Sequence, residues 1–391
     1  MIKSKIVLDV HAPTTPAGEK VYLAGSLNAW KEGDPNYAFK EVEPGKFRLE
    51  LELSRGTLLE YKLNRGTWKS VEVDTIGAEN ENRRLAVFGS TTITIDIPHW
   101  RDQASARTAA PRIAKTNVRT LGPFAIPSLG RDREIVVYLP PNYDLEPDRR
   151  FPVMYMFDGQ NLFDPYTAFN MDWGVDDTCD TLIAQGALQP LIVVGIYNGG
   201  EHRLSEQSPW RDMRLNATGE GHAFMRWVVS WLKSYVDTEF RTLTGPDHTG
   251  IGGSSLGGLT SLFAAYRYPL VFGRVAALSP AFWFARSQIF RYIASQPHPV
   301  GAKLYLDCGE KETARVHPKR DFYKVAASMV ELLIQQGFTE DVDLKWVTDP
   351  KGTHSEYHWA RRIGPALEFL FPGDRRPLRL QETPAPDAAM R

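Results

Sequence analysis

The amino-acid sequence predicts an α/β fold with a mainly parallel sheet, preceded by a separate all-β sandwich. Two observations lead to this prediction. Residues 1–98 contain short alternating apolar runs, separated by turn-rich pieces such as EPGK and NRGT. From residue 116 onward, short apolar runs alternate with amphipathic segments, which is the strand and helix order of a sheet covered on both faces.

The first region supplies strands without a helical period. Ile6, Leu8 and Val10 alternate with polar or smaller residues and predict the first strand. Further strands are expected at VYLAG, FRLELEL, LEYKL, KSVEVD and TTITIDI. A region of this length and pattern is typical of a small β-sandwich. The polar, Ala- and Pro-containing residues 99–115 are predicted to be a linker.

The second region, residues 116–372, is predicted as one α/β domain. Its strands are expected at EIVVYLP, PVMYMF, LIVVGIYN, HTGIGG, RVAALSP, KLYLDCG and DLKWVTD. Helices are expected near 177–185 and 223–240, from 259, near 323–336, and up to 371. Residues 373–391 are rich in Pro and charge, so we expect a disordered tail.

Composition excludes several classes of protein. The chain has 391 residues, a length that suggests two domains, and 46 basic against 47 acidic side chains, so no basic excess favours nucleic acid or membrane binding. Its longest apolar runs fall far short of the roughly 20 residues that span a bilayer. Two cysteines exclude a disulfide scaffold, and the nine histidines show no HExxH or CxxC spacing, so we expect neither a metal nor another cofactor. The start MIKSKIVLDV lacks a signal peptide, which predicts a cytoplasmic protein unless an export signal was trimmed.

The strongest chemical signal is the GxSxG pentapeptide at residues 253–257. It follows the strand-like HTGIG and precedes the apolar helix LTSLFAAY, which is the strand, turn and helix setting of a nucleophile elbow. Small flanking residues permit a sharp turn, so Ser255 is the candidate nucleophile. The alternative is a glycine-rich connection without chemistry.

A serine hydroxyl needs a base, and in this architecture the acid and the histidine follow the serine in the chain. His354 lies in the loop after DLKWVTD and is the preferred base, while His358, four residues later, is the alternative. His298 and His317 lie beside prolines in segments that follow no strand.

The acid is expected after the strand KLYLDCG, where Asp307, Glu310 and Glu312 are candidates. Glu312 is favoured because it lies far enough past the turn to face the histidine loop. Two backbone amides are expected to bind the oxyanion: that of Leu256, after the nucleophile, and that of Gln160, in the loop after PVMYMF.

The quoted motifs, together with GIGGSSLGGLTSLFAAYRYPLVFGRVAALSPAFWF, FDGQNLFD, LDCGEKE and THSEYHWARRIGPALEFLF, resemble the putative-esterase family of α/β-hydrolases. This family includes enterochelin, feruloyl and acetylxylan esterases and mycolyltransferases. The resemblance implies an α/β-hydrolase fold and a triad of Ser255, Glu312 and His354, with the acid three residues after Gly309. It also implies substrate contacts by Asp158 and Asn161 of DGQN, and by Arg203 and Glu206 of IYNGGEHRLSEQSPW, although the usual aromatic-proline end of that segment is less clear here.

The first region resembles a starch-binding type of carbohydrate module, through VYLAGSLNAW and EYKLNRGTWKSVEVDTIGAENENRRL. Such modules stack sugar rings on exposed tryptophans. The resemblance implies glycan contacts by Trp30 and Trp68, with Lys62 and Asn82 as polar neighbours. The alternative is a module that only packs against its neighbour.

The sequence therefore predicts a serine-dependent carboxylic-ester hydrolase that forms an acyl-enzyme, with sugar-linked acetyl or feruloyl esters as the expected substrates. A siderophore or lactone esterase, with Arg203 facing an anionic ligand, is the second hypothesis. A third is a glycan-binding protein with a degenerate hydrolase domain, and a peptidase is a further alternative. The expected partners are a small-molecule or carbohydrate ester and a glycan, without nucleic acid or membrane.

Overall fold

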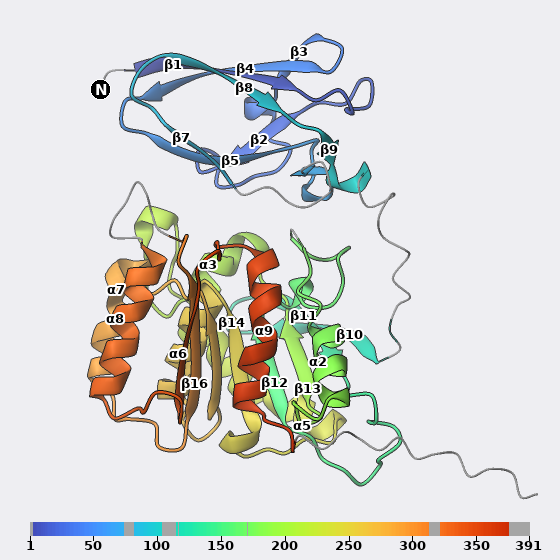
Figure 1. Ribbon diagram of the computed structural model, residues 1–391, viewed down its shortest axis with the longest axis vertical. Helices are drawn as coiled ribbons and strands as arrows, with labels where there is room; N and C mark the ends of the chain where they lie inside the picture. The colour runs from blue at the N-terminus through green and yellow to red at the C-terminus, as the bar shows by residue number, and fades with distance from the viewer. Residues whose placement is uncertain are drawn as a thin grey trace, which may run out of the picture. The chain divides into compact units, whose positions relative to one another are not determined.

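The computed structural model describes residues 3–73, 82–103, 115, 117–169, 171–312 and 321–374. The chain forms two compact units, coloured along the sequence in Figure 1. The first unit consists of Met1–Ala114 and Pro165–Met171, and the second of Lys115–Asp164 and Asp172–Arg391. Each unit is described separately below.

The first unit is an all-β structure. Its described strands form sheets in the orders β3-β4-β1-β8, β2-β5-β7 and β6-β9. On β1, Ile6, Leu8 and Val10 are buried and alternate with more exposed residues, as the sequence pattern predicts. The strand bounds are β1 Lys3–His11, β2 Tyr22–Gly25, β3 Lys40–Glu43, β4 Lys46–Ser54, β5 Leu58–Asn64, β6 Glu72–Val73, β7 Arg83–Ala86, β8 Thr91–Asp96 and β9 His99–Trp100, with short 3-10 helices at Pro35–Tyr37 (η1) and Trp68–Ser70 (η2).

The boundary of the first unit differs from the predicted one. Residues 99 and 100 were expected to begin a linker, but they form β9, which pairs with β6, and Trp100 is fully buried in the core of the unit. At the other end of the predicted linker, Lys115 belongs to the second unit and pairs with Asp177 at 2.5 Å. Residues 104–114 and most of the predicted tail, 375–391, lie outside the described residues.

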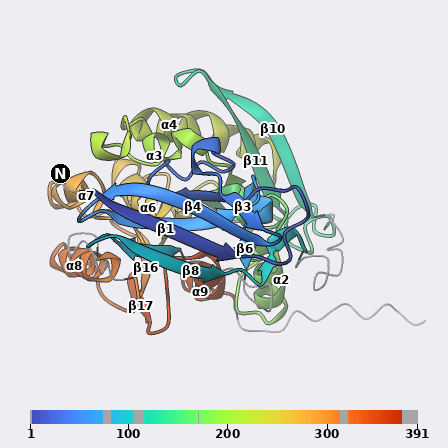
Figure 2. The ribbon, with the colours of Figure 1, turned by 90° about the horizontal axis from the view of Figure 1, so that it is seen from above.

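The second unit is built on a sheet of eight described strands in the order β10-β11-β13-β12-β14-β15-β16-β17. From β13 to β17 in this order the strands are parallel, while β10 and β11 form an antiparallel hairpin at the edge. The hairpin extends past the sheet beside α4 (Figure 2). The bounds are β10 Val118–Ile126, β11 Arg131–Tyr138, β12 Val153–Phe157, β13 Ile192–Ile196, β14 Thr249–Ser254, β15 Arg274–Leu278, β16 Lys303–Gly309 and β17 Leu344–Asp349.

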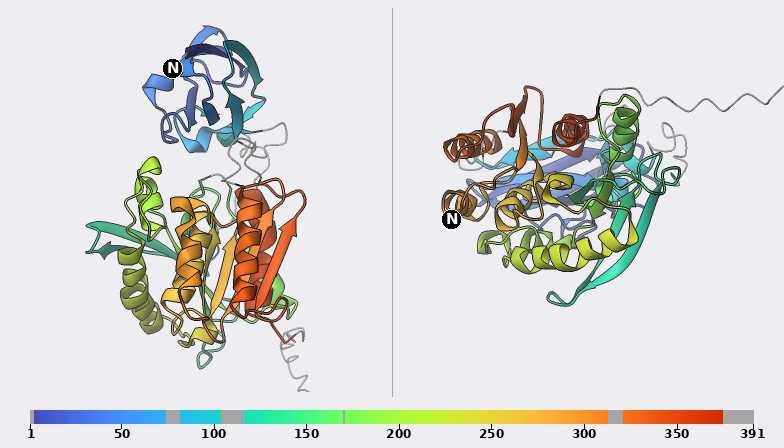
Figure 3. Two further views of the ribbon diagram at one scale, coloured as in Figure 1. Left: turned by 90° about the vertical axis from the view of Figure 1, so that its left-hand side faces the viewer. Right: turned by 90° about the horizontal axis from the view of Figure 1, so that it is seen from below.

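Helices cover both faces of this sheet (Figure 3). On β12, Val153, Tyr155 and Phe157 point into the core shared with α4 to α8, while Met154 and Met156 point into the core shared with α2 and α9. Near-continuous apolar strands are the expected signature of a sheet buried on both faces. The helices are α2 Val175–Ala184, α3 Arg203–Glu206, α4 Gly221–Trp227, α5 Lys233–Glu239, α6 Leu256–Arg267, α7 Phe284–Ala294, α8 Phe322–Gln335 and α9 Glu356–Leu370, with a π-helix at Val228–Leu232 (η6) and 3-10 turns at Gly159–Asn161 (η3), Gly200–His202 (η4), Met213–Leu215 (η5) and Pro246–His248 (η7).

The predicted α/β architecture is thus confirmed, with a mainly parallel sheet and an additional all-β region. In the part of the chain that the structure describes, no helix combines the length and apolar character needed to cross a bilayer.

Candidate active site

The carboxyl ends of neighbouring parallel strands carry the predicted catalytic residues. Ser255 directly follows β14, Glu312 lies in the loop after β16, and His354 lies in the loop after β17. These strands lie in the order β14-β15-β16-β17, with β15 between the nucleophile strand and the acid strand. In open α/β sheets, ligands bind in the crevice outside the carboxyl ends of the strands.

The Ser255 backbone is strained, with φ 56° and ψ −116° at the turn between β14 and α6. The flanking glycines allow this turn because the backbone passes close to its neighbours. A Cβ atom at Gly253 would lie 3.2 Å from Gly257 Cα, and one at either glycine would lie 3.1 Å from Phe157 Cβ. Ser255 is partly exposed although α6 behind it is almost entirely buried, so the turn presents its hydroxyl at the sheet edge.

Glu312 and His354 are hydrogen-bonded. His354 Nδ1 lies 2.8 Å from Glu312 Oε2, and this contact joins residues 42 positions apart. The His354 ring also contacts two aromatic rings, those of Phe322 at 4.1 Å and Trp359 at 4.9 Å between centroids. An acceptor on Nδ1 fixes the tautomer that leaves Nε2 free to take a proton. The orientation of the imidazole is therefore fixed by its carboxylate and by packing.

The charge on Glu312 is stabilised in this site. Burial alone raises the pKa of the carboxyl, but hydrogen bonding and charge from His354, together with Arg362 and Ser279, lower the pKa to about 2. The Glu312 side chain is fully buried and is ionised at neutral pH. It can thus stabilise an imidazolium on His354.

The other acid and base candidates have different partners. His358 Nδ1 contacts the hydroxyls of Thr353 and Ser355, and burial lowers the pKa of its ring. Glu310 is exposed and accepts from Thr348. Asp307 is fully buried within β16, where burial raises its pKa to about 7. None of these three contacts His354 in the described structure, and His317 lies outside it.

The two predicted oxyanion donors start from adjacent strands. Leu256 is the first residue of α6, so its N–H has no carbonyl partner within the helix. Gln160 lies in η3 after β12, the neighbour of β14, and its side-chain Oε1 accepts the Asn198 N–H. Within the described residues no hydrogen bond joins the Ser255 hydroxyl to His354. The proton transfer and the oxyanion roles therefore stay predictions.

Two predicted substrate contacts are ion-paired with each other. The Asp158 carboxylate is buried and accepts both Nε and a terminal nitrogen of Arg203 at 2.7 Å, with Asn198 and Gln207 as further donors. Burial opposes the charge, but Arg203 and these donors lower the pKa of Asp158. Asp158 thus anchors Arg203 at the sheet edge. The Arg203 guanidinium stays charged, and the Asp158 carboxylate balances its charge. Asn161 is almost buried, and its carbonyl accepts the Trp173 N–H.

Glu206, a predicted substrate contact, is buried and ion-paired, and its contact with substrate stays a prediction. Its side chain is 1% exposed, and both oxygens lie 2.8 Å from Arg133, with Arg131 at 3.0 Å. Removing one partner of a buried pair leaves an uncompensated charge, so this pairing gives Glu206 a structural role. The sequence did not reveal this role because Arg131 and Arg133 lie more than 70 residues upstream.

The predicted glycan residues of the first unit are only partly exposed. The Trp30 and Trp68 rings are 6.3 Å apart, and Trp68 also packs against Phe169 at 4.7 Å. Phe169 lies in Pro165–Met171, the segment that belongs to the first unit. Asn82 is exposed, whereas Lys62 is buried on β5, so Lys62 is not positioned to contact a sugar. The aromatic pair is present, but one neighbour of Trp68 was missed.

Sequence reasoning also missed a buried polar network behind the acid. It consists of Ser279, which follows β15, and of Trp359 and Arg362 on α9. The only sequence signal was a serine directly after the strand RVAAL, the position that Ser255 has relative to β14.

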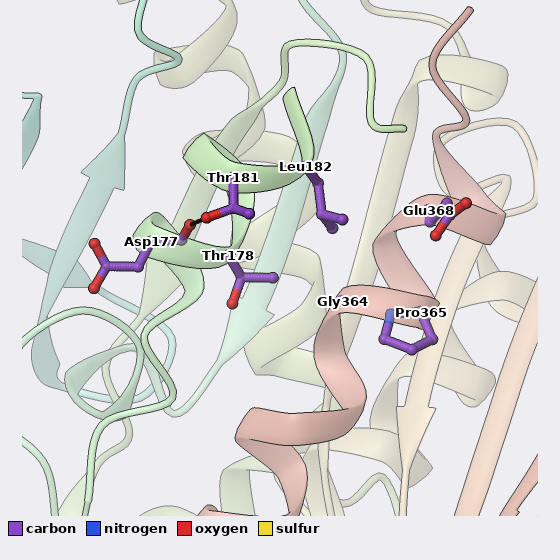
Figure 4. A pocket seen from close by; sticks show the side chains of 7 residues that line it. All are labelled: Asp177, Thr178, Thr181, Leu182, Gly364, Pro365 and Glu368. Carbon is purple, nitrogen blue, oxygen red and sulfur yellow. Dashed lines mark hydrogen bonds between the residues drawn. The ribbon is translucent and has the colours of Figure 1, made fainter. Parts of the chain in front are cut away.

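Two cavities of the second unit lie away from these residues. One, of about 330 Å³, lies between α2 and α9 and is lined by residues such as Thr178, Leu182 and Pro365 (Figure 4). The other, of about 290 Å³, lies beside Trp231 and Tyr235. Neither includes a predicted catalytic residue, so neither defines the acyl or alcohol pocket.

A comparison with protein families matches residues 126–370 to the model described as "Putative esterase". The Bacillus subtilis protein YbbA, itself described as uncharacterized, is 26% identical over 253 residues, covering 63% of this chain and 96% of YbbA. The iron(III) salmochelin esterase of Escherichia coli is 24% identical over 201 residues, covering 48% of this chain and 44% of that protein. A Niallia circulans α-amylase is 40% identical over 91 residues, which is 23% of this chain but only 7% of the amylase.

Solved structures share the fold. A ferulic acid esterase superposes with a TM-score of 0.51 at 17% identity, covering 65% of this chain and 97% of its own. The enterochelin esterase of Shigella flexneri superposes with a TM-score of 0.54 at 14% identity, covering 93% of this chain and 91% of its own. At these identities the likeness establishes the architecture, and the chemistry must be argued from the residues.

Proposed function

The chain belongs to the putative esterase family, a family of ester hydrolases, and we propose that it works through a serine nucleophile and an acyl-enzyme. The observation that carries this proposal is the 2.8 Å hydrogen bond between His354 Nδ1 and Glu312 Oε2, at the same sheet edge as the strained Ser255. An oriented imidazole beside an elbow serine is the arrangement that serine acyl transfer requires.

The proposed reaction uses groups of the chain itself. Ser255 Oγ attacks the ester carbonyl while His354 Nε2 takes the hydroxyl proton, and the Glu312 carboxylate stabilises the imidazolium. The Leu256 and Gln160 amides bind the developing oxyanion. His354 then returns the proton to the leaving alcohol, and water attacks the acyl-enzyme by the same steps in reverse order.

Sugar-linked acetyl or feruloyl esters are the proposed substrates. The fold shared with a ferulic acid esterase and the 91-residue similarity to an α-amylase support this choice. The first unit contributes the Trp30 and Trp68 pair, which we propose contacts a glycan. Aromatic rings suit this role because a pyranose presents an apolar C–H face.

A siderophore or lactone ester is the second candidate. It is supported by the relative named as a salmochelin esterase and by the enterochelin esterase structure, which superposes over most of the chain. The ion pair of Arg203 with Asp158 weighs against Arg203 as a free cation for an anionic ligand. Substrate choice thus has to be measured directly.

The test is a panel of p-nitrophenyl acyl esters, methyl hydroxycinnamates and the cyclic trilactone enterobactin, each with wild type and Ser255→Ala. The proposal expects turnover by wild type and its loss in the variant. Turnover that survives Ser255→Ala would reject the serine mechanism, and only trace turnover of p-nitrophenyl acetate, equal in wild type and variant, would favour a glycan-binding protein with a degenerate hydrolase unit. Preference for the hydroxycinnamates or for the trilactone decides between the two substrate classes.

A further inference from the structure

Ser279 lies at the carboxyl end of β15, between the nucleophile strand and the acid strand, and is fully buried. Its hydroxyl contacts Glu312 Oε1 at 2.7 Å, the Trp359 indole nitrogen at 2.9 Å and an Arg362 terminal nitrogen at 2.8 Å. We propose that Ser279 is a positioning residue that holds the Glu312 carboxylate so that its other oxygen faces His354. This inference rests on the proposed serine-esterase function.

The direction of each hydrogen bond follows from the chemistry of the partners. Indole and guanidinium nitrogens only donate, so Trp359 and Arg362 fill both lone pairs of the Ser279 oxygen. The one hydroxyl hydrogen is then left for Glu312 Oε1, which as a carboxylate oxygen can only accept. Ser279 therefore cannot turn its hydrogen elsewhere without losing a partner in a site closed to water.

The two carboxylate oxygens of Glu312 have separate partners. Oε1 accepts from the Ser279 hydroxyl and from the Gly309 N–H at 2.8 Å, and Arg362 lies 3.4 Å away. Oε2 accepts from His354 Nδ1. Because Oε1 is already fixed by two close donors, rotation of the carboxylate away from His354 would break both of them.

The same network reaches the imidazole from a second side. The Trp359 indole that donates to Ser279 also contacts the His354 ring, edge to face, at an interplanar angle of 87°. The base and the acid are thus oriented through one tryptophan and one serine. A residue that only filled space would not link the two groups in this way.

The backbone at Ser279 supports the same conclusion. Its φ is 41°, in the region that disfavours side chains, although the residue is not glycine. Its N–H donates to the Asp307 carbonyl at 3.0 Å and lies 3.1 Å from Asp307 Oδ1. A non-glycine residue with a positive φ is uncommon, so this strained position is consistent with a role for the Ser279 side chain.

Several titratable groups face the Glu312 carboxylate. They come from three elements: His354 from the loop after β17, Arg362 from α9, and Asp307 and Cys308 from β16. Asp349 at the end of β17 acts on Asp307 and on His358. Because the Ser279 hydroxyl is neutral, removing it leaves the formal charge of this cluster unchanged.

The test variant is Ser279→Gly, which removes the hydroxyl and relieves the positive φ. Ser279→Ala removes the hydroxyl and keeps the strained backbone. If both variants have the same effect, that effect comes from the lost hydroxyl and not from the backbone. The matched control is Ser261→Ala, another fully buried serine, whose hydroxyl donates to the Gly257 carbonyl and not to this network. Folding of each variant is compared by its urea midpoint.

The first measurement is the pH dependence of p-nitrophenyl acetate hydrolysis. We expect Ser279→Gly to lower kcat about tenfold to a hundredfold with KM nearly unchanged, as for loss of a hydrogen bond to a charged group. We also expect the acid limb of kcat/KM to move to lower pH, because an imidazolium with a displaced carboxylate is less stable. Ser261→Ala should match wild type in kcat and in the position of the acid limb.

The second measurement does not need turnover. In the Ser255→Ala background, the proton shared between His354 and Glu312 should give a downfield proton NMR signal, identified by its absence in His354→Asn. Ser279→Gly should broaden or abolish this signal, and Ser261→Ala should keep it. If no ester is hydrolysed, the proposed function fails while this signal still tests the network.

The positioning role is overturned by either of two results. One is that Ser279→Gly changes neither the downfield proton NMR signal nor kcat. The other is an acid limb that moves to higher pH, which would show that the carboxylate stays in place and only becomes more basic.

Discussion

Trp359 lies edge-on to His354, with ring centroids 4.9 Å apart, so the imidazole is oriented by the helix that follows its own loop. A second ring contact, with Phe322 on α8, comes from the helix after the acid loop. The position of the base is therefore set by the packing of two helices on the sheet edge.

Ser255→Ala should abolish esterase activity, with a loss of at least about a thousandfold in kcat. The reason is that no other described hydroxyl occupies the elbow between β14 and α6. Steady-state hydrolysis of p-nitrophenyl acetate measures the loss. The neighbouring Ser254, buried as the last residue of β14, provides the matched control, and Ser254→Ala should retain most activity if the variant folds.

Glu312 should make folding stability depend on pH in the acid range. Its pKa is lowered to about 2 from an unperturbed 4.5, so its contribution is fully present above pH 4.5 and is lost as the pH falls toward 2. The contribution amounts to about 3 kcal/mol. Urea unfolding of wild type between pH 5 and pH 2.5 should show this decline. Glu312→Gln should show a shallower one, and equal slopes would contradict the low pKa.

Glu206→Gln should destabilise the fold by about 3 kcal/mol, because it leaves the buried Arg133 without its carboxylate. Activity per folded molecule should change little, since Glu206 faces away from solvent. Glu220, a more exposed partner of Arg131, is the control, and Glu220→Gln should cost under about 1 kcal/mol. A large rise in KM without loss of stability would support Glu206 as a substrate contact.

Trp68→Ala should remove glycan binding if the first unit binds starch-like chains. Affinity electrophoresis in soluble starch measures this as loss of retardation. Because Phe169 packs on Trp68, Phe169→Ala should uncover ring surface and increase retardation. Trp231, a partly exposed tryptophan of the second unit, is the control, and Trp231→Ala should migrate as wild type does. Wild-type migration unaffected by starch would reject glycan binding.

Local pattern located most strands and helices of the second unit and the candidate site residues that follow its strands, but it missed the edge strand β10 and the helix α7. The glycines around Ser255 are read from the sequence because a sharp turn needs them whatever surrounds it. Glu312 and His354 could be located because parallel strands bring their carboxyl ends to one edge, so position after a strand predicts neighbourhood. The hydrogen bond between them agrees with that expectation.

The partners of buried polar groups were decided only by the tertiary structure. Glu206 resembles a loop carboxylate until Arg133, 73 residues away, is packed against it, and Lys62 resembles a surface lysine until its strand is buried. Ser279 gains its role only when α9 places Trp359 and Arg362 over it. Sequence periodicity indicates which face of a helix or strand is apolar. Pairing between distant polar groups depends on how the helices pack on the sheet and exclude water from these groups.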